Sequence, residues 1–104
     1  MKIILTFTDN NKIARKIAKQ LISKKIAACT HIYQEAEAFY MWDDKLVNEK
    51  EYIIQVKTNS KNTDRACNLI REIHNYKVPA ILVLDSKIMN EEYSTWFDKS
   101  IENK

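Results

Sequence analysis

The 104-residue chain has no glycine, one proline and two cysteines. Without glycine it cannot contain a P-loop or a GxGxxG turn, so the common nucleotide-binding loops are excluded. No apolar run approaches the roughly 20 residues of a membrane-spanning helix. The first eight residues are too short and too alternating for a signal peptide. Cys29 and Cys67 form no CxxC pair, so we expect free thiols in a reducing cytoplasm.

The chain also has no large excess of charge of either sign. The chain has 17 Lys and Arg against 14 Asp and Glu, a net charge of +3 at pH 7. These charges are scattered along the sequence, so we expect no basic stripe and no nucleic-acid partner. The length predicts a single domain over residues 1–104.

In a chain without glycine, turns that need a positive φ must use the next most tolerant residues, Asn and Asp. Chain breaks are therefore expected at six polar positions: Asp43, Asp44, Asn48, Asn59, Asn75 and Asn90.

Hydrophobic periodicity predicts eight elements. Strands are expected over 2–8, 26–33, 36–42, 51–58 and 80–84. Helices are expected from Thr8 or Asp9 through Ile22, from Asn59 to His74, and from Asn90 onward. The order β-α-β-β-β-α-β-α is typical of an α+β, ferredoxin-like split βαβ sandwich with an extra hairpin and a C-terminal helix. Two helices cover only one face of such a sheet, so the apolar second face predicts self-association.

The segment from His74 to Pro79 joins a predicted helix to a predicted strand. A neutral imidazole is a common metal ligand, and His74 with Tyr76 could border a ligand cleft. The alternative is a helix C-terminal histidine that only interacts with the last carbonyls and the helix dipole.

Cys29 and His31 are two residues apart on a predicted strand, which places both side chains on one face. Such a pair could hold a soft metal, although two donors make an incomplete site. Burial of Cys29 as a small apolar side chain is the alternative. Similarly, four aromatic residues could line a pocket or only pack in the core and at interfaces: Tyr40, Trp42, Trp96 and Phe97.

Five segments, taken in order, resemble the CutA family, the divalent cation tolerance proteins. Residues 21–29 (LISKKIAAC) resemble its L-V-x-x-x-L-A-A-C stretch, and residues 40–45 (YMWDDK) resemble its Y-x-W-x-G-K turn. Residues 51–58 (EYIIQVKT) fit E-x-x-x-x-x-K-T, residues 74–79 (HNYKVP) fit H-P-Y-x-V-P, and residues 93–96 (YSTW) fit Y-x-x-W.

This resemblance implies a cytoplasmic homotrimer of ferredoxin-like subunits with ligand clefts between them, and a binding protein rather than an enzyme. It implies copper or another divalent cation as the metal, with His74 and Cys29 as candidate ligands. Trp42, Lys57 and Tyr76 are the candidate binding residues for a small ligand, with Lys57 facing an anionic group. The alternatives are a scaffolding trimer for protein partners without a bound metal, and a small enzyme that uses Cys29 or His74.

The chain departs from the family pattern at several of the matched positions. Asp44 replaces the turn glycine, Asn75 replaces the first proline of H-P-Y, and Ala80 replaces an acidic residue. Thr6 and Ile73 stand where some copper-linked relatives carry Cys and His, and neither supplies a soft donor. Further ligands to a metal at His74 are therefore expected from another subunit.

Overall fold

The computed structural model describes residues 1–101, which form a four-stranded antiparallel sheet and three α-helices. The strands are β1 (Lys2–Thr8), β2 (Cys29–Trp42), β3 (Lys45–Thr58) and β4 (Ile81–Asp85). The helices are α1 (Asn11–Ser23), α2 (Thr63–Ile73) and α3 (Glu91–Ser100), with a short 3₁₀ turn η1 (Ser60–Asn62) before α2. The sheet order β2-β3-β1-β4 is that of a ferredoxin-like fold, which confirms the predicted fold class.

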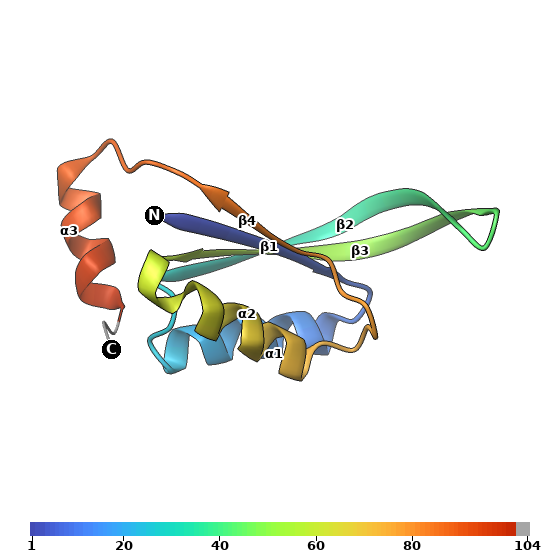
Figure 1. The fold of residues 1–104 in the computed structure, drawn as a ribbon, viewed down its shortest axis with the longest axis horizontal. Helices are drawn as coiled ribbons and strands as arrows, with labels where there is room; N and C mark the ends of the chain where they lie inside the picture. The colour runs from blue at the N-terminus through green and yellow to red at the C-terminus, as the bar shows by residue number, and fades with distance from the viewer. Residues whose placement is uncertain (102–104) are drawn as a thin grey trace.

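The strands predicted over 26–33 and 36–42 are one long strand, β2. A bulge places Gln34 and Glu35 opposite Tyr52 alone, and Glu35 has φ 58°. The bulge breaks the side-chain alternation, which is why the sequence pattern predicted two strands. The extra hairpin is therefore the far end of β2 and β3, which projects as a two-stranded ribbon beyond the rest of the sheet (Figure 1).

Ordinary residues adopt all four positive-φ conformations of the described chain. Asp43 and Asp44 (φ 50° and 61°) form the predicted two-residue turn of the ribbon. Lys25 (φ 57°) ends α1, where Ile26 N donates to Leu21 O at 3.0 Å in the arrangement usually completed by glycine. The Lys25 turn was not predicted, and Asn48 lies inside β3 rather than at a break.

The helix starts differ by a few residues from the predictions. Asn10, rather than Thr8 or Asp9, caps α1 and accepts from Ile13 N at 3.1 Å. Asn59 caps η1, and α2 begins only at Thr63. Asn90 caps α3 as predicted, accepting from the backbone N–H groups of Glu92 and Tyr93.

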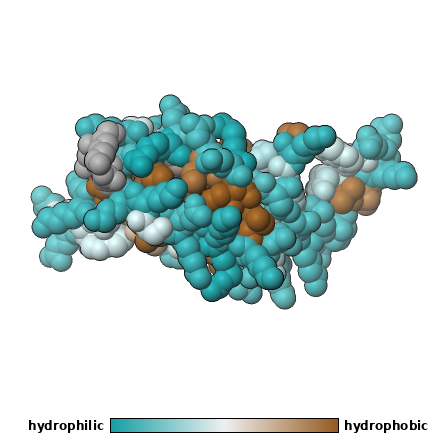
Figure 2. Space-filling view, turned by 90° about the horizontal axis from the view of Figure 1, so that it is seen from below, coloured by the Kyte–Doolittle hydropathy of each residue, from teal (hydrophilic) through white to brown (hydrophobic). Residues whose placement is uncertain are grey.

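Helices α1 and α2 lie side by side against one face of the sheet (Figure 1). Their buried stripes pack on alternate residues of the central strands, including Ile4, Ile54 and Val56. Ile22 lies outside this core and is 40% exposed. On the outer surface of α1, the side chains of Lys12, Arg15, Lys16 and Lys19 line a hollow of about 370 Å³. The prediction that no basic stripe exists was therefore wrong for this helix, whose side of the molecule is largely hydrophilic (Figure 2).

The other face of the sheet, called the open face below, has no helix layer over it (Figure 1). The strand register aligns Cys29 with Lys57, Ile3 and Leu84 in one row, and His31 with Gln55, Leu5 and Leu82 in the next. Helix α3 packs at one end of the sheet, where Phe97 and Ile101 form a small core with Ala28. Three of the predicted site residues, Cys29, Trp42 and Lys57, lie along this open face.

Candidate functional site

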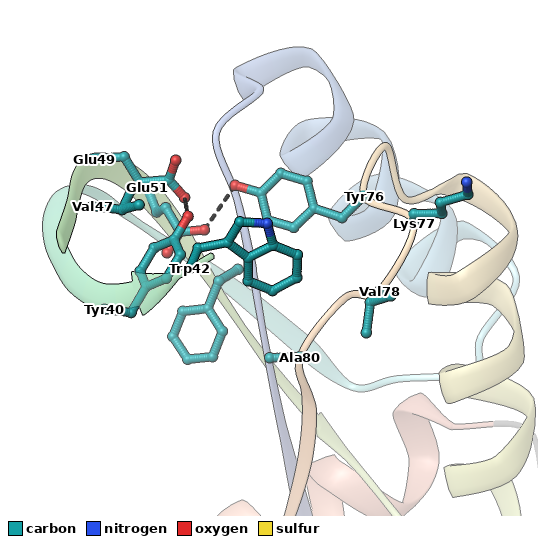
Figure 3. Close-up of a pocket in the computed structure, with 10 residues that line it drawn as sticks. Tyr40, Trp42, Val47, Glu49, Glu51, Tyr76, Lys77, Val78 and Ala80 are labelled. Atoms are coloured by element: carbon teal, nitrogen blue, oxygen red, sulfur yellow. Dashed lines mark hydrogen bonds between the residues drawn. The ribbon is translucent and has the colours of Figure 1, made fainter. Parts of the chain in front are cut away.

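A pocket of about 500 Å³ lies where the ribbon meets the connector between α2 and β4 (Figure 3). Its walls come from β1, β2, β3 and the connector: Phe7, Tyr40, Trp42, Val47, Glu49, Glu51, Tyr76, Lys77, Val78 and Ala80. The volume is in the range of sites for small molecules.

Two carboxylates of β3 give the pocket its polarity. The Tyr76 hydroxyl donates to Glu51 Oε2 at 2.7 Å, and the Tyr40 hydroxyl donates to Glu49 Oε1 at 2.9 Å (Figure 3). Burial, followed by the hydrogen bond to Glu51, raises the pKa of Tyr76. The hydrogen bond to Glu49 raises the pKa of Tyr40. Both phenols therefore stay protonated and hold the carboxylates in place.

The connector is fastened to the end of β1 by its first two residues, His74 and Asn75. His74 Nε2 donates to Phe7 O at 2.9 Å, and Tyr76 N donates to His74 Nδ1 at 3.0 Å. Asn75 Nδ2 donates to Asp9 Oδ1 at 2.9 Å, and Thr8 Oγ1 donates to Asn75 Oδ1 at 2.5 Å. Asn75 thus anchors the connector by its side chain at the position where the family motif has proline, and the position of Tyr76 depends on these bonds.

His74 lies behind the pocket wall, and both of its ring nitrogens are engaged in the bonds to Phe7 O and Tyr76 N. Burial lowers the pKa of His74, against the weaker effects of the Phe7 carbonyl and of Asp9 and Glu51. A metal ion could bind this ring only by displacing one of the two bonds. Metal ligation by His74 stays a prediction.

A histidine whose folded-state pKa is lowered makes stability depend on pH. The unfolded chain, with a His pKa of about 6.5, binds the proton more readily, so His74 stabilises the fold above that pH and the effect is lost as the pH falls. We expect the Tm of the wild type to drop between about pH 7.5 and about pH 5.5 by more than that of His74→Gln.

The matched control for this measurement is His31→Gln, which removes an exposed histidine instead. Its Tm should fall with pH as much as the wild type's. An equal pH dependence in wild type and His74→Gln would contradict the role assigned to His74.

The structure divides the predicted site residues into two groups. Trp42 and Tyr76 lie together in the pocket, with His74 beside them. Lys57 and Cys29 lie six or more residues along the sheet from Glu51, about 20 Å away at the usual strand rise. Lys57 Nζ donates to the Tyr93 hydroxyl of α3 at 3.4 Å instead. Lys57 therefore cannot share a ligand with Trp42 and Tyr76 within one chain.

The aromatic pocket is formed by only half of its predicted members. Tyr40 and Trp42 line it, whereas Phe97 is buried under α3 and Trp96 is half-exposed on that helix.

The sequence analysis missed the two carboxylates, Glu49 and Glu51. Its strand began only at residue 51, which left Glu49 in the turn, whereas β3 begins at Lys45. The signal was the alternation of Val47, Glu49, Glu51 and Ile53, which puts all four side chains on one face. Within residues 1–101 no group of three or more His, Cys, Asp and Glu side chains converges on a metal position. A cation in the pocket would therefore keep much of its water shell.

The comparisons with known proteins agree in sequence and in structure. The family model for the CutA1 divalent ion tolerance protein matches residues 2–100. The Divalent-cation tolerance protein CutA of Pyrococcus horikoshii is 33% identical over 96 residues, 92% of this chain and 93% of that protein. The Thermococcus kodakarensis protein of the same name is 33% identical over 94 residues, 90% of this chain and 89% of that protein.

Two solved structures extend this likeness to the fold. The crystal structure of CutA1 from Pyrococcus horikoshii has a TM-score of 0.90 and 31% identity, covering 98% of this chain and 99% of that one. CutA1 from Ehrlichia chaffeensis has a TM-score of 0.89 and 29% identity, covering 95% and 92%. Since the family model spans nearly the whole chain, the protein belongs to the CutA1 divalent ion tolerance family.

Proposed function

We propose that this chain contributes to the tolerance of divalent cations as a binding protein, not as an enzyme. We propose that it binds a cation in the pocket that contains Glu49 and Glu51. The observation that supports this most directly is the pair of carboxylates in a cavity walled by aromatic rings, each carboxylate held by a tyrosine hydroxyl. Oxygen donors of this kind suit hydrated divalent cations. The names of the relatives, divalent-cation tolerance proteins, support the same class of ligand.

The charge of the pocket favours a cation over the small anion considered from the sequence. Lys77 is the one cationic residue among the lining side chains, against the two carboxylates. Lys57, the residue expected to face an anion, is bound to Tyr93 at the far end of the sheet.

Copper fits the proposal as a probe because Cu²⁺ binds nitrogen and oxygen sites more tightly than the other first-row divalent ions. Glu49 and Glu51 would hold it through carboxylate oxygens, and water would complete the coordination. The bonds that engage both His74 nitrogens favour this carboxylate site over one built on His74.

We further propose that three copies assemble through the open face, and that the protein acts in the cytoplasm. Several large apolar side chains on this face stand at least half or nearly half exposed on the ribbon and β4, including Trp42, Leu82 and Leu84. Exposed apolar area of this extent marks an interaction surface. No helix within residues 1–101 is long and apolar enough to cross a membrane. We expect no nucleic-acid or membrane partner.

A scaffolding trimer is the alternative function. A cavity that holds two oriented carboxylates favours a ligand-binding role over it, because a scaffold has no need of carboxylates held inside a cavity.

Titration with Cu²⁺ by calorimetry tests the pocket, in a Cys29→Ser background that removes the more exposed of the two thiols. We expect saturable binding that Glu49→Gln and Glu51→Gln each weaken by about tenfold or more, since each removes one charged oxygen donor. Lys57→Gln is the matched control and should leave the affinity unchanged.

Two results would count against the proposal. The first is the absence of saturable binding, which would favour the scaffold. The second is a Cu²⁺ affinity that is unchanged in both glutamine variants but lost in His74→Gln. That result would identify His74 as the metal ligand.

A further inference from the structure

Helix α1 carries positive charge along its outer surface, on the side of the molecule opposite to the open face (Figure 1). Four exposed residues, three or four positions apart, form what is called the α1 stripe below: Lys12, Arg15, Lys16 and Lys19. The buried residues of the helix, such as Ile17 and Leu21, lie on its other side against the sheet. The α1 stripe therefore stays in solvent when copies of the chain pack over the open face.

No carboxylate within the described chain neutralises the α1 stripe. Residues 10–34 contain six Lys and Arg and no Asp or Glu. The one ion pair of residues 1–101 joins Lys2 to Asp85 on the sheet. Because the net charge of the whole chain is only +3, this stretch concentrates positive charge that the rest of the sequence balances.

This arrangement lowers the stability of the helix when nothing is bound to it. Residues three or four apart are neighbours on a helix surface, so Lys16 repels both Lys12 and Lys19. The first turn has no acidic residue, although the helix dipole is positive there and Lys12 adds to it. An anionic ligand would relieve both effects.

The α1 stripe also has the shape and the donors of a site for a small anion. Together with Gln20 it lines the hollow of about 370 Å³ on the outer surface of α1. The Arg15 guanidinium can donate two parallel hydrogen bonds to one phosphate, and each lysine ammonium offers three donors. The stripe extends about 10 Å along the helix axis. A compact ligand with several phosphate groups can therefore meet more than one of its cations at once.

The composition of the hollow argues against larger partners. Protein interfaces are centred on aromatic and apolar side chains, and single-stranded nucleic acids stack on aromatic rings. The lining residues include neither kind. A helix that lies on a membrane inserts its apolar side, whereas the apolar side of α1 is buried against the sheet.

We propose that the α1 stripe binds a triphosphate group, free or at the end of a larger molecule. Arg15 holds one phosphate through paired hydrogen bonds, and the lysines neutralise the charge of the others. This site goes beyond the proposed function, because it binds an anion on the other side of the sheet. It would persist if the pocket bound no cation.

The test is calorimetric titration of the full chain with inorganic triphosphate in metal-free buffer. We expect saturable binding that weakens as salt is added, and at least tenfold weaker binding of monophosphate, which meets fewer cations. Arg15→Gln/Lys19→Gln should weaken triphosphate binding by about tenfold or more. The same variant should raise the Tm of the ligand-free protein, because glutamine is a comparable helix former and removes like-charge neighbours.

The matched control is Lys61→Gln/Arg65→Gln, which removes the same charge from two exposed residues at the start of α2. It should keep the triphosphate affinity, as should Glu49→Gln/Glu51→Gln in the pocket. Adenosine triphosphate should bind no more tightly than inorganic triphosphate, because no ring lines the hollow to hold the base.

Four results would overturn the inference. The first is the absence of saturable triphosphate binding to the wild type, and the second is an equal loss of affinity in the α2 control. The third is a stripe variant with a lower Tm and unchanged affinity, which would make the role structural. The fourth is a DNA duplex or a phosphatidylserine vesicle that binds through Arg15 and Lys19 more tightly than triphosphate does.

Discussion

Thr8→Val should destabilise the protein, whereas Thr6→Val, the same change two residues away on the same face of β1, should stabilise it. Both side chains are fully buried. Thr8 Oγ1 donates to Asn75 Oδ1 and accepts from Asn10 N at 3.1 Å, so valine would leave two groups without their partner. Asn10 and Asn75 are exposed residues, so water can partly replace these bonds, and we expect a loss of about 1 kcal/mol in the free energy of unfolding, the usual net contribution of an intramolecular hydrogen bond.

We expect Thr6→Val to raise the free energy of unfolding, because the Thr6 hydroxyl has no hydrogen-bond partner among the described residues. Valine has nearly the same shape and removes the unpaired group, so we expect a gain of about 1 kcal/mol. Urea unfolding at one fixed protein concentration measures both effects, since assembly makes apparent stability depend on concentration.

The pair also tests how the pocket is supported. Thr8→Val loosens the connector through Asn75 and should weaken Cu²⁺ binding, while Thr6→Val should leave it unchanged. Equal stability changes of the same sign in both variants would show that the Thr8–Asn75 bond does not hold the connector.

The order of the elements was predictable from the sequence because the apolar stripes of α1 and α2 and the alternation of β1 follow local rules. The continuity of β2 was not, because the bulge at Gln34 and Glu35 reverses the alternation and only the pairing with β3 reveals one strand. The order of apolar and polar residues along β2 alone does not show which residues of β3 pair with it.

The site was only half predictable for a related reason. Trp42 and Tyr76 were predicted from motifs. Glu49 and Glu51, which line the pocket with them, were not predicted, because the expected strand began at residue 51 whereas β3 begins at Lys45. Asn75 was predicted only as a chain break. Its role in fastening the connector depends on Thr8 and Asp9, more than 60 residues earlier in the chain. Contacts at that separation depend on the sheet topology rather than on local sequence.

The proposed trimer leads to the prediction with the largest effect, which concerns Leu84 on the open face. Leu84 pairs with Ile3 at the edge strand β4 and is 48% exposed. If copies of the chain pack over this face, a buried carboxylate without a partner would oppose assembly strongly. Light scattering of the wild type should give three times the 12.3 kDa of one chain, and Leu84→Glu should reduce the mass to that of one chain.

Ile22→Glu is the matched control, because Ile22 is 40% exposed and apolar but lies on α1, on the opposite side of the sheet. It should keep the wild-type mass, since the helix-covered side of the sheet lies outside the proposed interface. A wild type that is monomeric would refute the trimer, and a Leu84→Glu variant that stays trimeric would move the interface away from the open face.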